Sequence, residues 1–207
     1  MPNIAEIDSK LAVLRPVLRS YPPSISSDEQ RREVERRWHE AEDALKRFDE
    51  AHPNQSPVEY RMGELYRFGN NLDVKGAADE CVEHLQRAVA LQPDFAEAYL
   101  ELGMFYTDSG PRWASLGETN LKKAIELSRP TPVPRAWRAL SLAYYYQTKF
   151  TQAVSAADRY LLLVPDDEEV RQIKTLAADA AARGATEVPP RLRANLLTSP
   201  TQQSHVQ

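Results

Sequence analysis

The stretch AWRALSLAYYYQTKFTQAVSAADRYLLLVP, residues 136–165, decides the fold. Its first half carries large side chains at Trp137, Leu140 and Tyr144, separated by three and four residues, which places them on one face of a helix. Its second half repeats this spacing with mostly smaller side chains, at Ala153, Ala157 and Tyr160. Pro165 then ends the second segment, because proline cannot continue a helix. The stretch therefore predicts two helices joined by a short turn.

Two looser copies of this pattern come earlier in the chain. The second copy carries Tyr99, Leu102, Gly103 and Tyr106, followed by Gly117, Leu121, Ala124 and Pro130. The first copy carries Met62, Gly63 and Tyr66, followed by Cys81, Leu85, Ala88 and Pro93. Small residues at matching positions let two helix backbones approach closely, and the large residues fill the space between successive hairpins.

The pattern resembles the tetratricopeptide repeat, a helical hairpin of about 34 residues with an aromatic-x2-Leu-Gly-x2-Tyr first helix and a terminal proline. This resemblance implies an all-α, right-handed α-solenoid with an N-terminal helical hairpin and a C-terminal capping helix. The three repeats are expected at about residues 57–93, 94–130 and 132–165, roughly half of the chain. Such a fold indicates a binding surface and leaves the partner open.

Two amphipathic segments precede the repeats, within residues 1–53. Their apolar residues follow a three-four spacing: Ile4, Ile7, Leu11, Leu14 and Leu18 in one, Val34, Trp38, Ala41, Leu45 and Phe48 in the other. Ser27 is a start signal for the second helix, which should run to about Ala51. We expect a hairpin that covers the open face of the first repeat, or a degenerate repeat. The alternative is a homodimerisation element.

The repeat region, residues 54–184, should close with a capping helix over residues 167–183 that stops at Gly184. Acidic residues at the start of this helix offset its dipole. Residues 185–207 are polar and proline-containing, which predicts a loose tail. Within the tail, Leu192, Leu196 and Leu197 form a candidate docking segment.

The first repeat has about six extra residues between its helices relative to the third. Residues 69–76 (GNNLDVKG) carry turn chemistry at both ends and are expected to form a loop. Loops of this kind on a solenoid are either tolerated insertions or binding elements.

Bulk properties narrow the class of partner. The net charge of −4 and the isoelectric point near 5.7 argue against nucleic acid as the main partner. A single cysteine, Cys81, permits no internal disulfide and suits a reducing compartment. No secretory signal or membrane span is apparent, so we expect a cytoplasmic protein.

No catalytic, cofactor-binding or metal-binding motif accompanies the repeats. The four histidines (His39, His52, His84 and His205) lie far apart, without the spacing of a metal pair. His84 is expected at the surface or at the rim of the core. We therefore expect no catalytic residues, no cofactor, no metal and no enzymatic activity.

In the tetratricopeptide family the first helices line a concave groove. Carried over to this chain, the resemblance implies these partner-binding residues: Tyr60, Arg67, Phe68, Leu100, Met104, Arg135, Arg138, Leu142, Tyr145 and Tyr146. Aromatic side chains, Met and Arg are enriched at protein interfaces. The expected function is thus an adaptor or scaffold that binds a protein or peptide. The alternatives are an assembly subunit that homodimerises through its N-terminal helices, or a small cytoplasmic chaperone for a secreted client.

Overall fold

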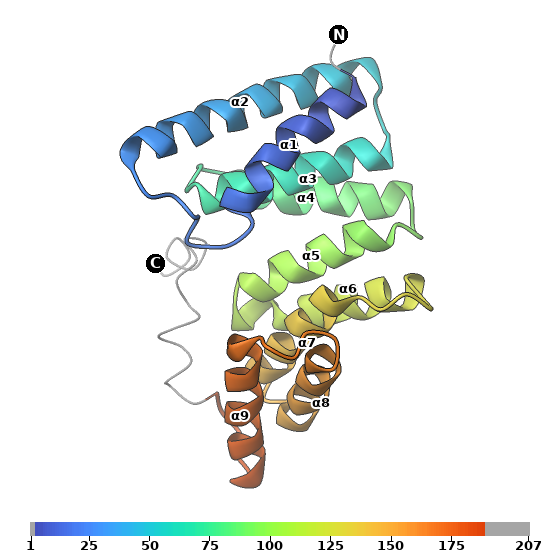
Figure 1. The fold of residues 1–207 in the computed structure, drawn as a ribbon. Coiled ribbons are helices and arrows are strands. Elements are labelled where there is room, and N and C mark those ends of the chain that lie inside the picture. The colour runs from blue at the N-terminus through green and yellow to red at the C-terminus, as the bar shows by residue number, and fades with distance from the viewer. Residues whose placement is uncertain (1–2, 189–207) are drawn as a thin grey trace. The chain divides into compact units, whose positions relative to one another are not determined.

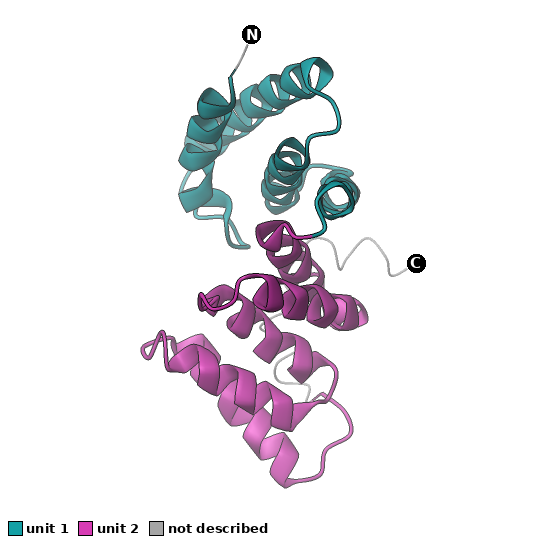
Figure 2. Ribbon diagram, turned by 90° about the vertical axis from the view of Figure 1, so that its right-hand side faces the viewer, with its two compact units in different colours: residues 1–93, 198–207 teal, residues 94–197 magenta. Residues whose placement is uncertain are grey.

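The computed structural model describes residues 3–188, and all regular elements in that range are helical. In chain order they are α1 (Ile4–Leu18), α2 (Asp28–Ala51), α3 (Ser56–Asn71), α4 (Ala77–Leu91), α5 (Ala96–Asp108), the 3-10 helix η1 (Pro111–Trp113), α6 (Ala114–Leu127), α7 (Pro134–Tyr146), α8 (Phe150–Leu161) and α9 (Glu168–Ala182) (Figure 1). The described chain falls into two compact units, called unit 1 (residues 3–93) and unit 2 (residues 94–188) below (Figure 2).

Unit 1 contains the N-terminal helices together with the hairpin of repeat one. Helix α1 packs against both α2 and α3, and α3 pairs with α4. The apolar face of α1 is almost fully buried, with Ile7, Leu11, Leu14 and Leu18 no more than 1% exposed. The side chain of Ser27 caps α2 by accepting a hydrogen bond from the Gln30 N–H at 3.1 Å. The predicted start and end of this helix are thus observed.

The apolar seam of α2 is used inside unit 1. Trp38 is 1% exposed, and its indole N–H donates a hydrogen bond to the Leu65 carbonyl at 2.8 Å. A Cβ atom on Gly69 would lie 2.7 Å from the Trp38 ring, so only glycine fits there. Val34 and Leu45 are buried as well. Homodimerisation through this seam would therefore compete with the core of unit 1.

The extra residues of repeat one do not form the loop expected over residues 69–76. Helix α3 continues to Asn71, so the insertion lengthens the helix by about a turn and the connection begins at Leu72. The Asn71 side chain donates a hydrogen bond to the Leu18 carbonyl at 2.8 Å, at the end of α1. The added turn of α3 is held by α1 and α2, contacts that the local turn chemistry of the sequence could not reveal.

Unit 2 contains the hairpins α5–α6 and α7–α8, followed by α9. The predicted role of the small residues is visible in the first hairpin. A Cβ atom on Gly103 would lie 2.9 Å from the Leu121 amide nitrogen, and one on Gly117 would lie 2.3 Å from the Thr107 hydroxyl. In the second hairpin, Ala153 is fully buried. Close contact of the paired helices thus depends on small side chains at these positions.

Helix α9 covers the last hairpin by packing against α8 and α7. Asp167 caps it by accepting a hydrogen bond from the Val170 N–H at 3.0 Å. The helix ends before Gly184, whose φ of +61° lies in the left-handed region that glycine adopts readily. These bounds agree with the capping helix expected over residues 167–183.

Candidate partner-binding face

The first helices of unit 2 lie side by side: α5 packs beside α7, and α7 beside α9. Within this unit, one surface is formed by the side chains of these helices at the repeat positions predicted to contact a partner. We call this surface the unit 2 face and define it by Leu100, Met104, Asp108, Arg135, Arg138, Leu142, Tyr146 and Glu169. Glu169 joins the set because it lies on α9 and contacts Arg138.

The middle of the unit 2 face is apolar. Leu100 is 8% exposed, Leu142 is 9% exposed and Tyr146 is 7% exposed. Met104 is half-buried and packs against the same hydrophobic cluster. All four are among the partner-binding residues predicted from the sequence. Met104 is the most exposed of the four, and we use it below as the probe of this surface.

Tyr145 does not belong to the face, although it was among the predicted contact residues. Its side chain is fully buried in the hydrophobic cluster of unit 2, where its ring contacts Phe150 edge-to-face at 5.5 Å between centroids. A helix turns about 100° per residue, so Tyr145 and Tyr146 cannot both point the same way. The structure assigns Tyr146 to the surface layer and Tyr145 to the core.

The two arginines of α7 are engaged by carboxylates of the neighbouring first helices. Arg135 donates a hydrogen bond to Glu101 at 2.6 Å, and Arg138 donates one to Glu169 at 2.5 Å. The Arg138 guanidinium also lies 3.8 Å from Asp167. Acidic partners, which the sequence analysis did not identify, therefore accompany both arginines on this face. These pairs join residues more than thirty positions apart, so no local pattern could identify them.

Acidic groups dominate the electrostatics around Tyr146. Burial raises the pKa of its phenol, and the nearby carboxylates of Asp108 and Glu169 raise it further. Burial alone would lower the pKa of Arg138, but Glu169, Asp108 and Asp167 together raise it. At neutral pH the Tyr146 phenol is therefore neutral, and the Arg138 guanidinium stays charged beside these carboxylates.

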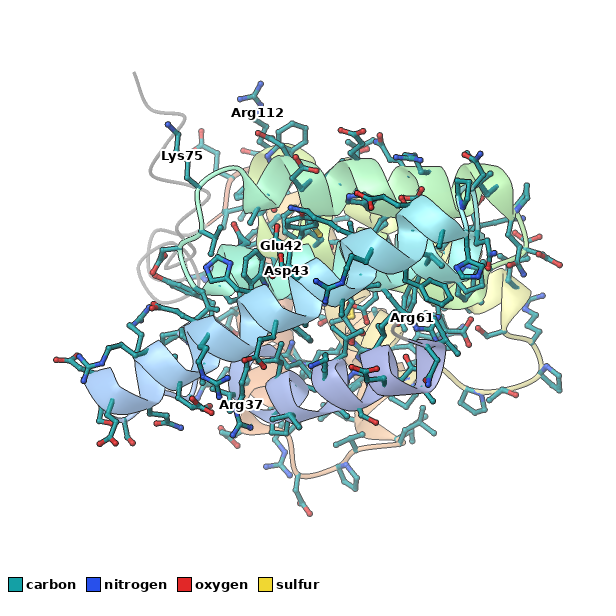
Figure 3. The ribbon with its side chains drawn as sticks, turned by 90° about the horizontal axis from the view of Figure 1, so that it is seen from above. Arg37, Glu42, Asp43, Arg61, Lys75 and Arg112 are labelled. Carbon is teal, nitrogen blue, oxygen red and sulfur yellow. The ribbon has the colours of Figure 1, made fainter. Side chains whose placement is uncertain are left out.

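In unit 1 the corresponding surface of α3 is covered by α1. Arg15 on α1 makes a two-pronged ion pair with Glu64 on α3, with both N···O distances 2.8 Å. Arg61 pairs with Asp8 in the same way, at 2.7 and 2.9 Å (Figure 3 labels Arg61). The chain's own helix therefore occupies the side of α3 on which a partner was predicted to bind.

The three predicted contact residues of repeat one are affected differently. Tyr60 is half-buried, Arg67 is 7% exposed and Phe68 is 2% exposed. Phe68 thus belongs to the interior of unit 1 and cannot meet a partner without rearrangement. Nothing in the sequence of α3 distinguishes a first helix open to a partner from one covered by α1.

His84 is buried, which corrects the expectation that it lies at the surface or at the rim of the core. Its Nδ1 lies 2.7 Å from the Glu59 carboxylate, and its ring stacks on Tyr66 at 5.5 Å between centroids. Arg87 also pairs with Glu59, at 2.7 Å. His84 and Arg87 on α4 thus both contact the buried Glu59 carboxylate of α3, whose Oε1 is ion-paired with Arg87 but makes no hydrogen bond. Among residues 3–188, no set of three or more His, Cys, Asp or Glu side chains is arranged to hold a metal ion.

Within the part of the chain that the structure describes, no helix has the length and apolar character needed to cross a membrane.

The arrangement of α3 to α8 as successive helical hairpins defines the class: a helical-repeat protein. Two similar solved structures specify the repeat. One is a thermophilic TPR (tetratricopeptide repeat) protein of Thermus thermophilus, with 19% identity, a TM-score of 0.54 and coverage of 84% of this chain and 92% of its own. The other is PilW, a widely conserved type IV pilus biogenesis factor, with 16% identity, a TM-score of 0.57 and coverage of 99% of this chain and 100% of its own.

At sequence identities this low, structural similarity establishes the fold alone. The chain has the tetratricopeptide-repeat fold, and the predicted all-α solenoid class is confirmed. No protein-family model and no curated protein sequence matches the chain.

Proposed function

We propose that this protein is a non-catalytic adaptor, and that its unit 2 face binds a segment of a partner polypeptide. The observation that carries the proposal is the apolar strip of Leu100, Met104 and Leu142, bordered by charged side chains on three adjacent first helices. An apolar centre with a polar rim is the usual composition of a protein interface. The tetratricopeptide-repeat fold supports a role in protein interaction in general.

The charge of the face restricts the class of partner. The described residues at this face include two arginines, Arg135 and Arg138, and four carboxylates, those of Glu101, Asp108, Asp167 and Glu169. A segment with Arg or Lys beside apolar residues therefore fits better than an acidic one. The unit 1 surface is a poorer candidate because α1 already fills it with two ion pairs. Binding in the cytoplasm is part of this proposal, and fractionation of the native source tests it.

A matched pair of variants tests the proposed function. Met104→Glu places a charge in the apolar strip, and we expect it to abolish capture of the partner from an extract of the native source. Leu162→Glu is the control, because Leu162 is 84% exposed at the end of α8 and lies outside the unit 2 face. Partners captured equally by both folded variants would rule out the face as the binding surface.

A further inference from the structure

The described chain ends against the hydrophobic cluster that contains the apolar residues of the unit 2 face. After α9, the Ala185 N–H donates a hydrogen bond to the Ala180 carbonyl at 2.9 Å, which turns the chain back towards the unit. Ala185 and Val188 then pack against the hydrophobic cluster that contains Tyr145 and Tyr146. The last described residue, Val188, is therefore anchored on the cluster to which Leu100, Leu142 and Tyr146 of the face belong.

The segment that follows Val188 has the composition that the face favours. Residues 189–197 are Pro-Pro-Arg-Leu-Arg-Ala-Asn-Leu-Leu, with two arginines, three leucines and no acidic residue. Its arginines are opposite in charge to the carboxylates of Asp108 and Glu169 on this face. Its leucines match the apolar strip on α5 and α7. The segment is thus complementary to the face in both charge and hydrophobicity.

A buried hydroxyl in the same hydrophobic cluster lacks a hydrogen-bond partner among the described residues. Tyr145 is fully buried and its hydroxyl makes no hydrogen bond. A buried polar group in this condition is costly, because it has lost its hydrogen bonds to water without replacing them. The first main-chain groups after Val188 belong to Pro189 and Pro190, which have carbonyl acceptors and no N–H. A proline carbonyl laid over the cluster would accept the hydrogen bond that Tyr145 can donate.

We propose that residues 189–197 of the same chain occupy the unit 2 face, with Arg191 and Arg193 towards the carboxylates of Asp108 and Glu169. The inference rests on the proposed function, because the segment then competes with the partner for one surface. Length is sufficient: nine extended residues span up to about 30 Å, whereas the thirteen residues of α7 span roughly 20 Å. A tethered segment binds at a high effective concentration, of millimolar order, so modest contacts are enough.

The three methionines of the chain provide a direct readout. The full chain carries two substitutions: Cys81→Ala removes its single cysteine, and Ala194→Cys provides the attachment site for a nitroxide spin label. The NMR signals of ¹³C-labelled methionine methyl groups are recorded before and after the nitroxide is reduced. We expect the Met104 signal to lose most of its intensity and to regain it on reduction. Met62 is 4% exposed in unit 1 and reports on the integrity of that unit. An unchanged Met104 signal would overturn the inference.

Two further samples complete the test. Arg191→Glu with Arg193→Glu in the labelled chain should release the segment and restore the Met104 signal, and persistent broadening would refute the charge assignment. The second sample mixes two forms of the chain: one carries ¹³C and no nitroxide, and the other carries the nitroxide and no ¹³C. The Met104 signal of the first form should stay sharp in this mixture. Broadening in the mixture would identify a second copy as the occupant and overturn the intramolecular proposal.

The outcome is separable from the test of the proposed function. If the Met104 signal stays sharp while the Met104→Glu variant still loses the partner, the face binds a partner. Only the proposal for residues 189–197 then fails. If the Met104 signal is broadened but the Met104→Glu variant keeps its partner, residues 189–197 occupy the face. The partner must then bind another surface of the protein.

Discussion

At the scale of single residues, Glu118 shows how a buried carboxylate joins successive elements of unit 2. It lies on α6 and accepts hydrogen bonds from Lys122 at 2.5 Å and from Lys149 at 2.7 Å, the latter in the turn before α8. Burial alone would raise its pKa, but the two lysines and Gln147 lower it to about 2 from the ordinary value of 4.5. The ionised form is therefore the one that the folded state stabilises.

This shift predicts a loss of stability in acid. Because the folded-state pKa is the lower one, the stabilisation is fully present above the ordinary pKa of 4.5 and disappears as the pH falls to about 2. The lysines are partly solvated, so we expect a contribution of roughly 1–2 kcal/mol to the free energy of unfolding. Glu118→Gln should remove that part of the pH dependence in urea titrations across this pH window. An unchanged pH profile in the variant would contradict the assignment.

At the scale of elements, α1 is held on α3 by a pair in which one member is deeply buried. Glu64 has a side chain only 6% exposed, and Arg15 is its bidentate partner. Arg15→Gln leaves a buried carboxylate without its cation and should lower the free energy of unfolding by about 2–3 kcal/mol. Adding Glu64→Gln should recover part of that loss in a double-mutant cycle. Additive losses from the two substitutions would show that the pair does not couple α1 to α3.

A second element-scale prediction concerns the closest helix contact of repeat three. Ala153 is fully buried on α8, and Ala153→Leu should overpack its contact at a cost of about 1–3 kcal/mol. Segment-resolved hydrogen exchange should then show α7, α8 and α9 opening first, because repeats contact mainly their neighbours. Partner binding should fall along with them. Equal loss of protection from α3 to α9 would instead indicate one cooperative core.

Some features of these elements could be predicted from the sequence and others could not. The hairpins, the cap at Ser27 and the start of α9 near residue 167 were predictable because their signals are local: helical spacing, small residues at fixed offsets, a capping side chain and acidic residues in the first turn. The longer α3 was not predictable, since its last turn is stabilised by Trp38 and Leu18 from other helices. The pairing of Arg138 with Glu169 was missed for the same reason.

At the scale of the whole molecule, the compact units do not coincide with the expected boundary near residue 53. The N-terminal hairpin shares unit 1 with repeat one, because α1 and α2 both pack on α3. The sequence analysis expected this hairpin to cover repeat one, with a homodimerisation element as the alternative. Of the predicted contact residues, those on α5 and α7 form a surface within unit 2, with Tyr145 excepted. The docking segment expected at Leu192, Leu196 and Leu197 lies outside the described residues.

The central claim is that a partner binds the unit 2 face, and hydrogen exchange with and without the captured partner tests it most directly. We predict that added protection is confined to α5, α7 and α9, with the largest change in the segments around Met104 and Leu142. Helices α6 and α8 should change little, since they are the second helices of their hairpins and carry none of the residues that define the face. Protection confined to α6 and α8, or to unit 1, would contradict the account.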